Sequence, residues 1–359
     1  MAKLILLTAL AVLLQVQLGS AYKLVCYFTN WSQYRPEPAK FFPKDVDPCL
    51  CTHLIYAFAT MNDNKIAPYE WNDIDVLYPG FQALKEHNKD LVTLLVVGGW
   101  NFGTQNQVKL LAVTYQEMIQ AFEEEAEEAG KPRLLITAAV SAGKETTDAG
   151  YEIAEIGKLL DFISMMTYDF HGGWDPCTGH NSPLHVGSKD QGNMRYFNCI
   201  CTFLSEATNA WIEDQKVPYA YKDTEWVGYD NIRNYKYKVD FLKENNFGGA
   251  MVWAIDLDDF LGSFCNEGKY PLILELQSLL GLSSGGSLLS LPHCSKDDAG
   301  QAARMATAEG QECMRQPQTS RPSHVKKGQV YRKKLFRNAF FNQRGQSKFS
   351  SYVASLEKA

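Results

Sequence analysis

Residues 162–176, FISMMTYDFHGGWDP, hold an apolar run that ends at a tyrosine and an aspartate and is followed by a Gly-Gly-Trp turn. The run predicts a buried β-strand that stops at Tyr168 and Asp169. A carboxylate at the end of an apolar strand is costly to desolvate unless it has a partner or a task. Asp169 is therefore the first candidate for a functional residue.

Five other segments share this nearly continuous apolar character, which is typical of parallel strands covered on both faces. They are residues 23–30, 52–60, 91–101, 133–142 and 248–257, while the run that contains Asp169 extends over 160–170. Helical patterns lie between them, at residues 81–88, 108–130, 151–159, 236–245 and 271–280. Strands that alternate with helices predict a parallel α/β fold.

Aromatic residues gather at the C-terminal ends of the predicted strands, the edge at which the loops of a (β/α)8 barrel form its site. They include Trp31, Phe58, Trp100 and Trp253, in addition to Tyr168. One interpretation is that each tryptophan only fills the mouth of the barrel as part of its core. The other is a sugar site, because aromatic faces stack on sugar rings while hydroxyl groups hydrogen-bond at the edges.

The N-terminal residues 1–21, MAKLILLTALAVLLQVQLGSA, have a lysine, an apolar run and a small-residue end. This pattern predicts a secretory signal peptide cut after Ala21, and the apolar run is short for the alternative, an anchoring helix. No later segment is apolar enough over a sufficient length to span a bilayer. We therefore expect a secreted, extracellular protein whose cysteines mostly form disulfides, and the odd number of nine leaves at least one thiol free or bonded to a second molecule. The spacing of cysteines and histidines predicts no metal site, and no cofactor is expected.

The net charge of −6 is unevenly distributed. Residues 283–359 contain 13 Lys and Arg against 5 Asp and Glu, whereas the remainder is acidic. This difference indicates a globular body at 22–282 and a separate basic tail. Residues 324–338 could meet heparin-like polymers or nucleic acid, but a solvated, disordered tail is the simpler prediction. We expect no nucleic-acid partner.

Five motifs identify a resemblance to a known family. They are YKLVCYFTNWSQYRP at 22–36, CLCTHLIYAFA at 49–59, TLLVVGGWNFGT at 93–104, MTYDFHGGWD at 166–175 and FGGAMVWAIDLDDFLGSFCNEGKYPLI at 247–273. In this order they closely resemble the vertebrate acidic chitinase and chitinase-like lectin group of glycoside hydrolase family 18, up to about Leu282. The resemblance implies a (β/α)8 barrel with a small inserted α+β domain, acting on β-1,4-linked N-acetylglucosamine.

The family's catalytic acid motif, Asp-x-x-Asp-x-Asp-x-Glu on the fourth strand, does not occur in this chain. The family's helix and acid-bearing strand would be expected at the junction of Asn106 and Gln107. A second gap follows Cys199, where the seventh strand and most of the inserted domain would come. We therefore predict an incomplete (β/α)8 TIM barrel, which lacks the units of the fourth and seventh strands and most of the α+β insertion domain. Because strand number, tilt and shear are linked, such a barrel should be distorted or open and of low stability.

The resemblance also implies the residues of a sugar groove. Tyr168 and Asp169 would be helper residues that hold the acetamido group of the sugar, with no catalytic residue intact. The groove would be lined by Tyr27, Trp31, Phe58, Trp100, Met166, Tyr168, Asp169 and Trp253. The family's disulfides would pair Cys26 with Cys51 and Cys201 with Cys265, which leaves Cys49 without an assigned partner.

Other carboxylates are poor candidates for the missing acid. Asp73 and Asp75 precede a Tyr-Pro-Gly sequence as in the acid motif, but Leu77 stands where the glutamate should be. Asp256 and Asp258 belong to a run that the family carries beside an intact acid, so a structural role is the simpler interpretation. A general acid must also come within hydrogen-bond reach of the glycosidic oxygen, and no feature of the sequence places these residues there.

Three interpretations follow. The first is a monomeric, secreted chitinase-like protein that binds chitin or chitooligosaccharides and is inactive as an enzyme. The second is an active endochitinase that uses an unrecognised acid. The third is a splice or gene-model variant without a stable fold or function.

Overall fold

The computed structural model describes residues 22–63, 65–99, 102, 112–142, 147, 150–170, 179–184, 207–223, 225–263, 265, 267–282 and 350–355. In this part of the chain no helix combines the length and apolarity that crossing a membrane requires.

All six predicted strands form. They are β1 (Lys23–Thr29), β2 (His53–Asn62), β4 (Val92–Val97), β5 (Ile136–Ser141), β6 (Phe162–Met166) and β10 (Gly249–Val252). β10, β1, β2 and β4 pair in parallel in that order, and β5 pairs in parallel with β6. A short strand, β3 (Lys65–Pro68), folds back antiparallel on β2. The prediction of an α/β fold built on parallel strands is confirmed.

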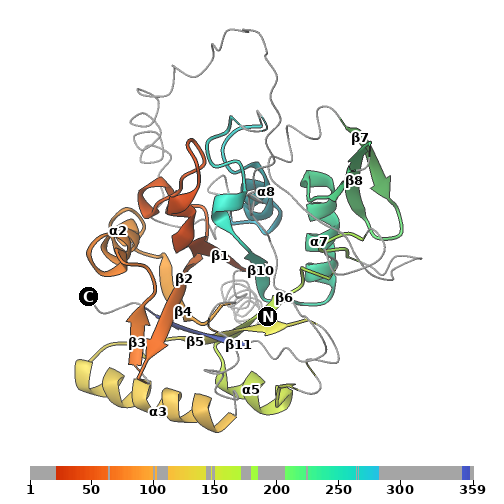
Figure 1. The fold of residues 1–359 in the computed structure, drawn as a ribbon. Coiled ribbons are helices and arrows are strands. Elements are labelled where there is room, and N and C mark those ends of the chain that lie inside the picture. The colour runs from red at the N-terminus through yellow and green to blue at the C-terminus, as the bar shows by residue number, and fades with distance from the viewer. Residues whose placement is uncertain are drawn as a thin grey trace, which may run out of the picture.

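The five predicted helical segments also form, and they cover the outside of the curved sheet (Figure 1). They are α2 (Tyr78–His87), α3 (Ala112–Ala129), α5 (Ile153–Leu159), α7 (Ile232–Glu244) and α8 (Pro271–Leu279). α2, α7 and α8 pack against the β10–β4 part of the sheet, whereas α3 and α5 pack against β5. The alternation of strand and helix thus places apolar helix faces on apolar strands.

A strand from the C-terminal tail lies between β4 and β5. This strand, β11 (Ser350–Ser355), pairs antiparallel with both neighbours, so the sheet order is β10-β1-β2-β4-β11-β5-β6. Residues 283–359 were expected to be a disordered tail, and these six residues depart from that expectation because two strand edges offer them hydrogen-bond partners. The basic segment 324–338 lies outside the described residues.

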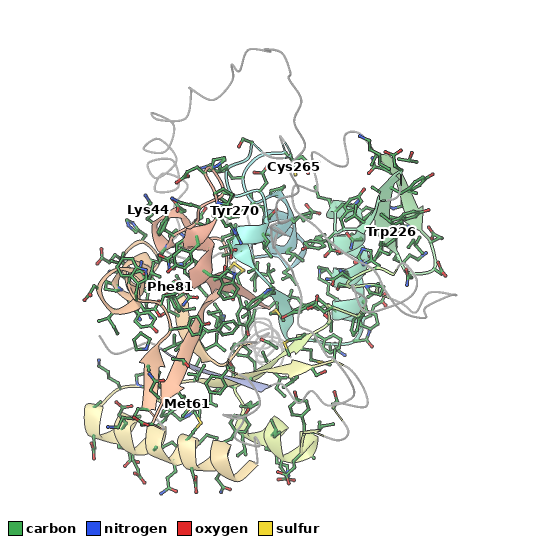
Figure 2. All side chains as sticks on the ribbon, in the orientation of Figure 1. Lys44, Met61, Phe81, Trp226, Cys265 and Tyr270 are labelled. Carbon is green, nitrogen blue, oxygen red and sulfur yellow. A yellow bond between two sulfur atoms is a disulfide. The ribbon has the colours of Figure 1, made fainter. Side chains whose placement is uncertain are left out.

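The strand order of the large sheet ends at β10 on one side and at β6 on the other. These two strands do not pair with each other in the described part of the chain. A second, three-stranded antiparallel sheet consists of β7 (Thr208–Ile212), β8 (Val217–Lys222) and β9 (Glu225–Gly228). It packs beside α7, where Arg233 lies 3.8 Å from the centre of the Trp211 ring. Figure 2 shows Trp226 on this small sheet, well away from Phe81 of α2.

Side chains fill both faces of the β10–β4 part. Phe28, Tyr56 and Phe81 are fully buried on the outer face, with ring centres 5.3–5.7 Å apart. Val25, Ile55 and Leu94 belong to an inner cluster on the opposite face. Because side chains on both faces are buried, both faces of these strands are covered.

The described cysteines are all bonded. Cys26 of β1 and Cys51, just before β2, form a disulfide, the pairing that the family resemblance implies. Cys265 is also disulfide-bonded, and its expected partner Cys201 lies outside the described residues. Cys49, to which the resemblance assigned no partner, is disulfide-bonded as well.

Candidate functional site

Three aromatic rings from three strand ends meet at one edge of the sheet. Trp31 stands in the turn after β1, Phe58 lies in β2, and Trp253 follows β10. The ring centre of Phe58 lies 5.6 Å from that of Trp31 and 5.7 Å from that of Trp253, with nearly parallel planes in both pairs. All three side chains are half-buried, so part of each ring remains open to a ligand.

Local backbone features hold Phe58 in this aromatic cluster of Trp31, Phe58 and Trp253. The side-chain amide of Asn30 donates a hydrogen bond to the backbone carbonyl of Phe58 at 3.1 Å, which connects β2 to the end of β1. Gly99, after β4, has a φ of +89°, and a Cβ atom there would lie 2.7 Å from the Phe58 ring. Only glycine allows that close approach, which explains the Gly-Gly sequence before Trp100. Trp100 itself lies outside the described residues.

Tyr27 packs against the Trp253 ring of the aromatic cluster. Its ring centre lies 5.1 Å from that of Trp253, and the side chain is 2% exposed. Burial raises the pKa of Tyr27 to about 12, with Ser164 of β6 acting weakly in the opposite direction. The Tyr27 hydroxyl is buried without a hydrogen-bond partner of acceptable geometry in the described structure. A buried polar group of this kind calls for a water molecule or a ligand.

Tyr168 and Asp169 follow β6 and belong to the same region. Burial raises the pKa of Tyr168 well above its usual range, and the charges of Tyr27 and Asp169 act in the same direction. Tyr168 is therefore within electrostatic range of Tyr27 at the end of β1. Asp169 has a φ of 58°, a left-handed conformation that aspartate tolerates better than most residues.

The turn that carries Tyr168 and Asp169 is attached to residues 180–182. The Asp169 amide donates to the Asn181 side-chain oxygen at 3.2 Å, and the Phe170 amide donates to the Asn181 carbonyl at 3.1 Å. The Ser182 hydroxyl donates to the carbonyl of Thr167 at 2.7 Å. Three hydrogen bonds therefore fix the position of the Asp169 backbone.

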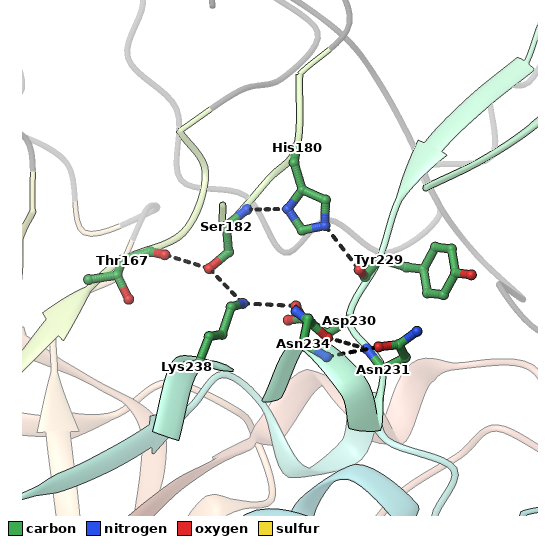
Figure 3. Close-up of polar contacts among 8 residues, drawn as sticks. All are labelled: Thr167, His180, Ser182, Tyr229, Asp230, Asn231, Asn234 and Lys238. Atoms are coloured by element: carbon green, nitrogen blue, oxygen red, sulfur yellow. Dashed lines mark hydrogen bonds and ion pairs between the residues drawn. The ribbon is translucent and has the colours of Figure 1, made fainter. Parts of the chain in front are cut away.

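A buried polar network connects this attachment to α7 (Figure 3). Lys238 donates to the Ser182 hydroxyl at 3.3 Å and to the Asp230 carboxylate at 2.8 Å. Burial acts to raise the pKa of Asp230, but the charge of Lys238 and hydrogen bonds from Lys238 and Asn234 outweigh it and hold the pKa below its usual range. The network thus places a stable ion pair behind the turn.

His180 completes the network with a defined tautomer. Its Nε2 donates to the carbonyl of Tyr229 at 2.9 Å, while its Nδ1 accepts from the Ser182 amide at 3.1 Å (Figure 3). A Cβ atom at Gly228 would lie 2.7 Å from the His180 ring, so glycine is required beneath it. Sequence reasoning missed these residues, because their partners are up to 56 positions apart in the chain.

Met166 ends β6 in a half-buried position, immediately before the turn. Trp71 was not predicted as a site residue, although its side chain is 81% exposed. Its neighbour Glu70 accepts a hydrogen bond from Tyr34, at the end of the turn that carries Trp31.

The alternative carboxylates have structural partners. Asp73 is fully buried and accepts hydrogen bonds from the Tyr56 hydroxyl and from the backbone amides of Tyr69 and Glu70. Asp256 pairs with Arg35 and accepts from Thr29, and burial raises its pKa against the influence of Arg35. Each of these carboxylates is therefore engaged by structural partners.

Asp258 also has a structural role. It accepts from the amides of Leu272 and Ile273, in the first turn of α8. In the described part of the chain, no group of three or more His, Cys, Asp or Glu side chains is arranged to hold a metal ion.

Comparison with known proteins gives consistent matches. The family described as Glycosyl hydrolases family 18 matches residues 23–112, 105–200 and 185–258. Oviduct-specific glycoprotein of Ovis aries is 37% identical over 78% of this chain and 71% of its own length. Chitotriosidase-1 of Mus musculus is 38% identical over 76% of this chain and 81% of its own length.

Two solved structures show the range of activities among similar proteins. Human YKL-39, described as a pseudo-chitinase with retained chitooligosaccharide binding properties, matches with a TM-score of 0.67 and 34% identity over 73% of this chain and all of its own. An immunomodulatory active chitinase from Trichuris suis matches with a TM-score of 0.66 and 33% identity over 72% of this chain and all of its own. Similar folds thus accompany both binding and hydrolysis.

Proposed function

Because the chain belongs to glycosyl hydrolase family 18, we propose that it is a secreted chitinase-like protein that binds chitin or N-acetylglucosamine oligosaccharides without hydrolysing them. The observation that carries this proposal is the aromatic cluster of Trp31, Phe58 and Trp253 beside Tyr168 and Asp169. Stacked aromatic faces with polar groups at their edge are suited to sugar rings. Binding by the pseudo-chitinase YKL-39 supports the same function in a chain of this family.

Catalytic inactivity follows from the missing acid. The full sequence contains no Asp-x-x-Asp-x-Asp-x-Glu motif, and Asp73, Asp256 and Asp258 are held by structural hydrogen bonds. A glycosidase without its general acid loses several orders of magnitude in rate. Asp169 and Tyr168 would then orient a bound acetamido group without any proton donor for the glycosidic oxygen.

The barrel itself is proposed to lack the units of the fourth and seventh strands and most of the α+β insertion domain. The family match supports this, because it is divided into three pieces that overlap at residues 105–112 and 185–200. The two junctions inferred from sequence, at 106–107 and 199–200, fall within these overlaps. The sheep relative also aligns over 383 positions while only 78% of this 359-residue chain takes part. The alignment must therefore contain many positions that have no counterpart here.

Secretion and the monomeric state complete the proposal. The signal-peptide pattern of residues 1–21 supports export, and the disulfide between Cys26 and Cys51 fits an oxidising compartment. The proposed groove residues are those named from sequence: Tyr27, Trp31, Phe58, Trp100, Met166, Tyr168, Asp169 and Trp253.

The test is expression in a secreting cell, followed by retention on chitin beads and a fluorogenic chitobioside assay on the same fraction. We expect retention without turnover. Trp253→Ala should weaken binding roughly 30-fold, about 2 kcal/mol, as the loss of a central aromatic contact does. Trp211→Ala is the matched control, because it removes the same ring from the small sheet.

Three outcomes would contradict parts of the proposal. Turnover that is abolished by Asp169→Ala would overturn the claim of inactivity. Equal binding by the wild type and Trp253→Ala would exclude the aromatic cluster as the sugar site. Absence of soluble protein in the medium would favour an unstable variant without function.

A further inference from the structure

β4 and β5 are joined through a strand that comes from the far end of the chain. Tyr352 to Ser355 face Val97 to Leu94 of β4, and Ser350 to Ala354 face Val140 to Ile136 of β5. β11 therefore exchanges backbone pairs with both strands at once. β11 runs antiparallel to β4 and β5. The other pairs in this strand order, β10 with β1, β1 with β2, β2 with β4 and β5 with β6, are parallel.

β4 and β5 are buried when β11 is in place, so its removal would leave two rows of backbone N–H and C=O groups without their partners. Leu94, Leu95, Val96 and Val97 of β4 are 0–8% exposed, and Ile136 to Ala139 of β5 are 0–5% exposed. Buried N–H and C=O groups in native proteins are almost always hydrogen-bonded. The facing edges of β4 and β5 therefore need an extended backbone segment between them as their hydrogen-bond partner.

We propose that residues 350–355 are an in-chain replacement strand, which fills the space between β4 and β5 and completes the sheet from within the same molecule. The recognition is β-augmentation, in which main-chain hydrogen bonds hold an added strand. This inference concerns the sheet and does not depend on whether the protein binds sugars.

The composition of the segment suits this position. Residues 350–355, SSYVAS, contain no charged residue and no proline, although the tail that contains them, residues 283–359, has 13 Lys and Arg. β4 (VTLLVV) and β5 (ITAAVS) are also uncharged, so an uncharged strand between them avoids burying an unpaired charge. Proline would remove a ladder hydrogen bond on one of the two sides.

Chain length permits insertion within one molecule. Residues 283–349 separate the end of the globular body from Ser350, and the maximal reach of 67 residues, roughly 220 Å, exceeds what is needed to return to the sheet of the same molecule. Such tethering gives a high effective concentration of the segment at its own sheet, which favours it over a second copy. Ser350 faces Val140 near the C-terminal end of β5, so the tail reaches the sheet at the edge that carries the aromatic cluster.

A disulfide trap tests the register directly in the full-length protein. Ser351 faces Ala139, and opposed residues of an antiparallel pair come within disulfide reach. We expect Ala139→Cys with Ser351→Cys to form a crosslink within one chain, found by peptide mass spectrometry. Ala139→Cys with Ser350→Cys is the register-shifted control and should crosslink at least tenfold less. Crosslinked dimers would overturn insertion within one molecule, and equal crosslinking in both variants or in neither would overturn the register.

Hydrogen exchange provides the second test. Tyr352→Pro with Ala354→Pro removes ladder donors from β11, and Ala306→Pro with Ala308→Pro is the matched change elsewhere in the tail. We expect amide exchange in β4 and β5 to accelerate at least tenfold in the first variant and to stay unchanged in the second. A peptide of residues 348–357 should restore protection to a chain that ends at Phe349. Unchanged exchange in the Tyr352 and Ala354 variant would contradict the proposal, and the disulfide trap decides the question if that variant does not fold.

Discussion

The two parts of the sheet on either side of β11 differ in how they are covered. The part formed by β10, β1, β2 and β4 packs against α2, α7 and α8 and buries large rings such as Phe28, Phe41 and Tyr56 completely. The part formed by β5 and β6 has a small outer cluster, which consists of Tyr115, Ile136, Ala138 and Ile156. On the outer face of β6, Ile163 and Met165 remain 41% and 44% exposed. The free energy of folding should therefore come mainly from the first part.

The largest expected effect is a cavity in the first part. Phe28 is fully buried, and its ring centre lies 5.4–6.0 Å from those of Phe41, Tyr56 and Phe81. Phe28→Ala should lower the free energy of unfolding by about 3–5 kcal/mol, measured by urea denaturation. Phe162→Ala removes the same ring from β6, where it is only half-buried, and should cost roughly half as much. Equal losses at the two sites would remove the energetic distinction between the two parts.

Acidification should weaken a contact between the two parts. His53 of β2 lies edge-on to Phe162 of β6, with ring centres 5.4 Å apart. Burial, with a smaller effect of Lys23, lowers the pKa of His53 to about 4, below the 6.5 of an unperturbed histidine. The unfolded chain therefore binds a proton at a higher pH than the folded chain does. The stability that neutral His53 contributes is complete above pH 6.5 and is lost as the pH falls towards 4, by about 3 kcal/mol.

Urea midpoints at pH 7.5, 6, 5 and 4 measure this loss. His53→Leu should flatten the pH dependence, because it removes the group whose pKa differs between the two states. His87→Leu is the control, since His87 is exposed at the end of α2 and its replacement should leave the dependence intact. An unchanged slope in His53→Leu would show that another group causes the acid sensitivity.

A smaller effect is expected from the network behind the Asp169 turn. Lys238→Met deprives Asp230 and Ser182 of the ammonium group that both contact, at a cost of about 2 kcal/mol. Because the pKa of Asp230 is lowered in the folded protein, this contribution persists above its unfolded pKa and is lost only as the pH falls through the folded value. The loss from Lys238→Met should thus be constant from pH 7 to 5, unlike the contribution of His53.

The network should also affect sugar binding through the position of Asp169. Chitooligosaccharide affinity should fall about tenfold in Lys238→Met, measured by calorimetry, and Lys238→Arg should restore part of it. Lys243→Met is the matched control, because Lys243 stands on the same helix and its side chain donates to the carbonyl of Leu279 instead. Equal affinity in Lys238→Met and the wild type would assign the network a purely structural role.

The parallel strands and the aromatic cluster could be predicted from sequence because both depend on local patterns. Continuous apolar runs mark strands, and residues just after parallel strands meet at one edge of the sheet, as Trp31, Phe58 and Trp253 do. The attachment of Asp169 was not predictable, because Asn181, Ser182 and Lys238 act through contacts between distant segments. The same is true of β11, since six uncharged residues in a basic tail become a strand only where two buried edges leave space for it.

The smallest expected change in stability is on the outer face of β6. Ile163 and Met165 lie on an end strand of the sheet and present two large apolar side chains to solvent. Replacing both with serine should lower the free energy of unfolding by only about 1 kcal/mol per site, because over 40% of each side chain is already exposed. Exposed apolar residues on an end strand favour association between chains, so the same change should reduce self-association.

Light scattering over a range of protein concentrations separates these two effects. We expect the wild type to be monomeric at low concentration and to associate only as its concentration rises, whereas the double variant should remain monomeric over the whole range, with only a small shift in its urea midpoint. Ile66→Ser with Val76→Ser is the control, because these side chains are also exposed but lie on β3 and before α2, near the well-covered part. If the control reduces association as much as the β6 variant does, general surface hydrophobicity is the cause. If only the β6 variant does so, the sparse cover of β6 is what limits the solubility of the molecule.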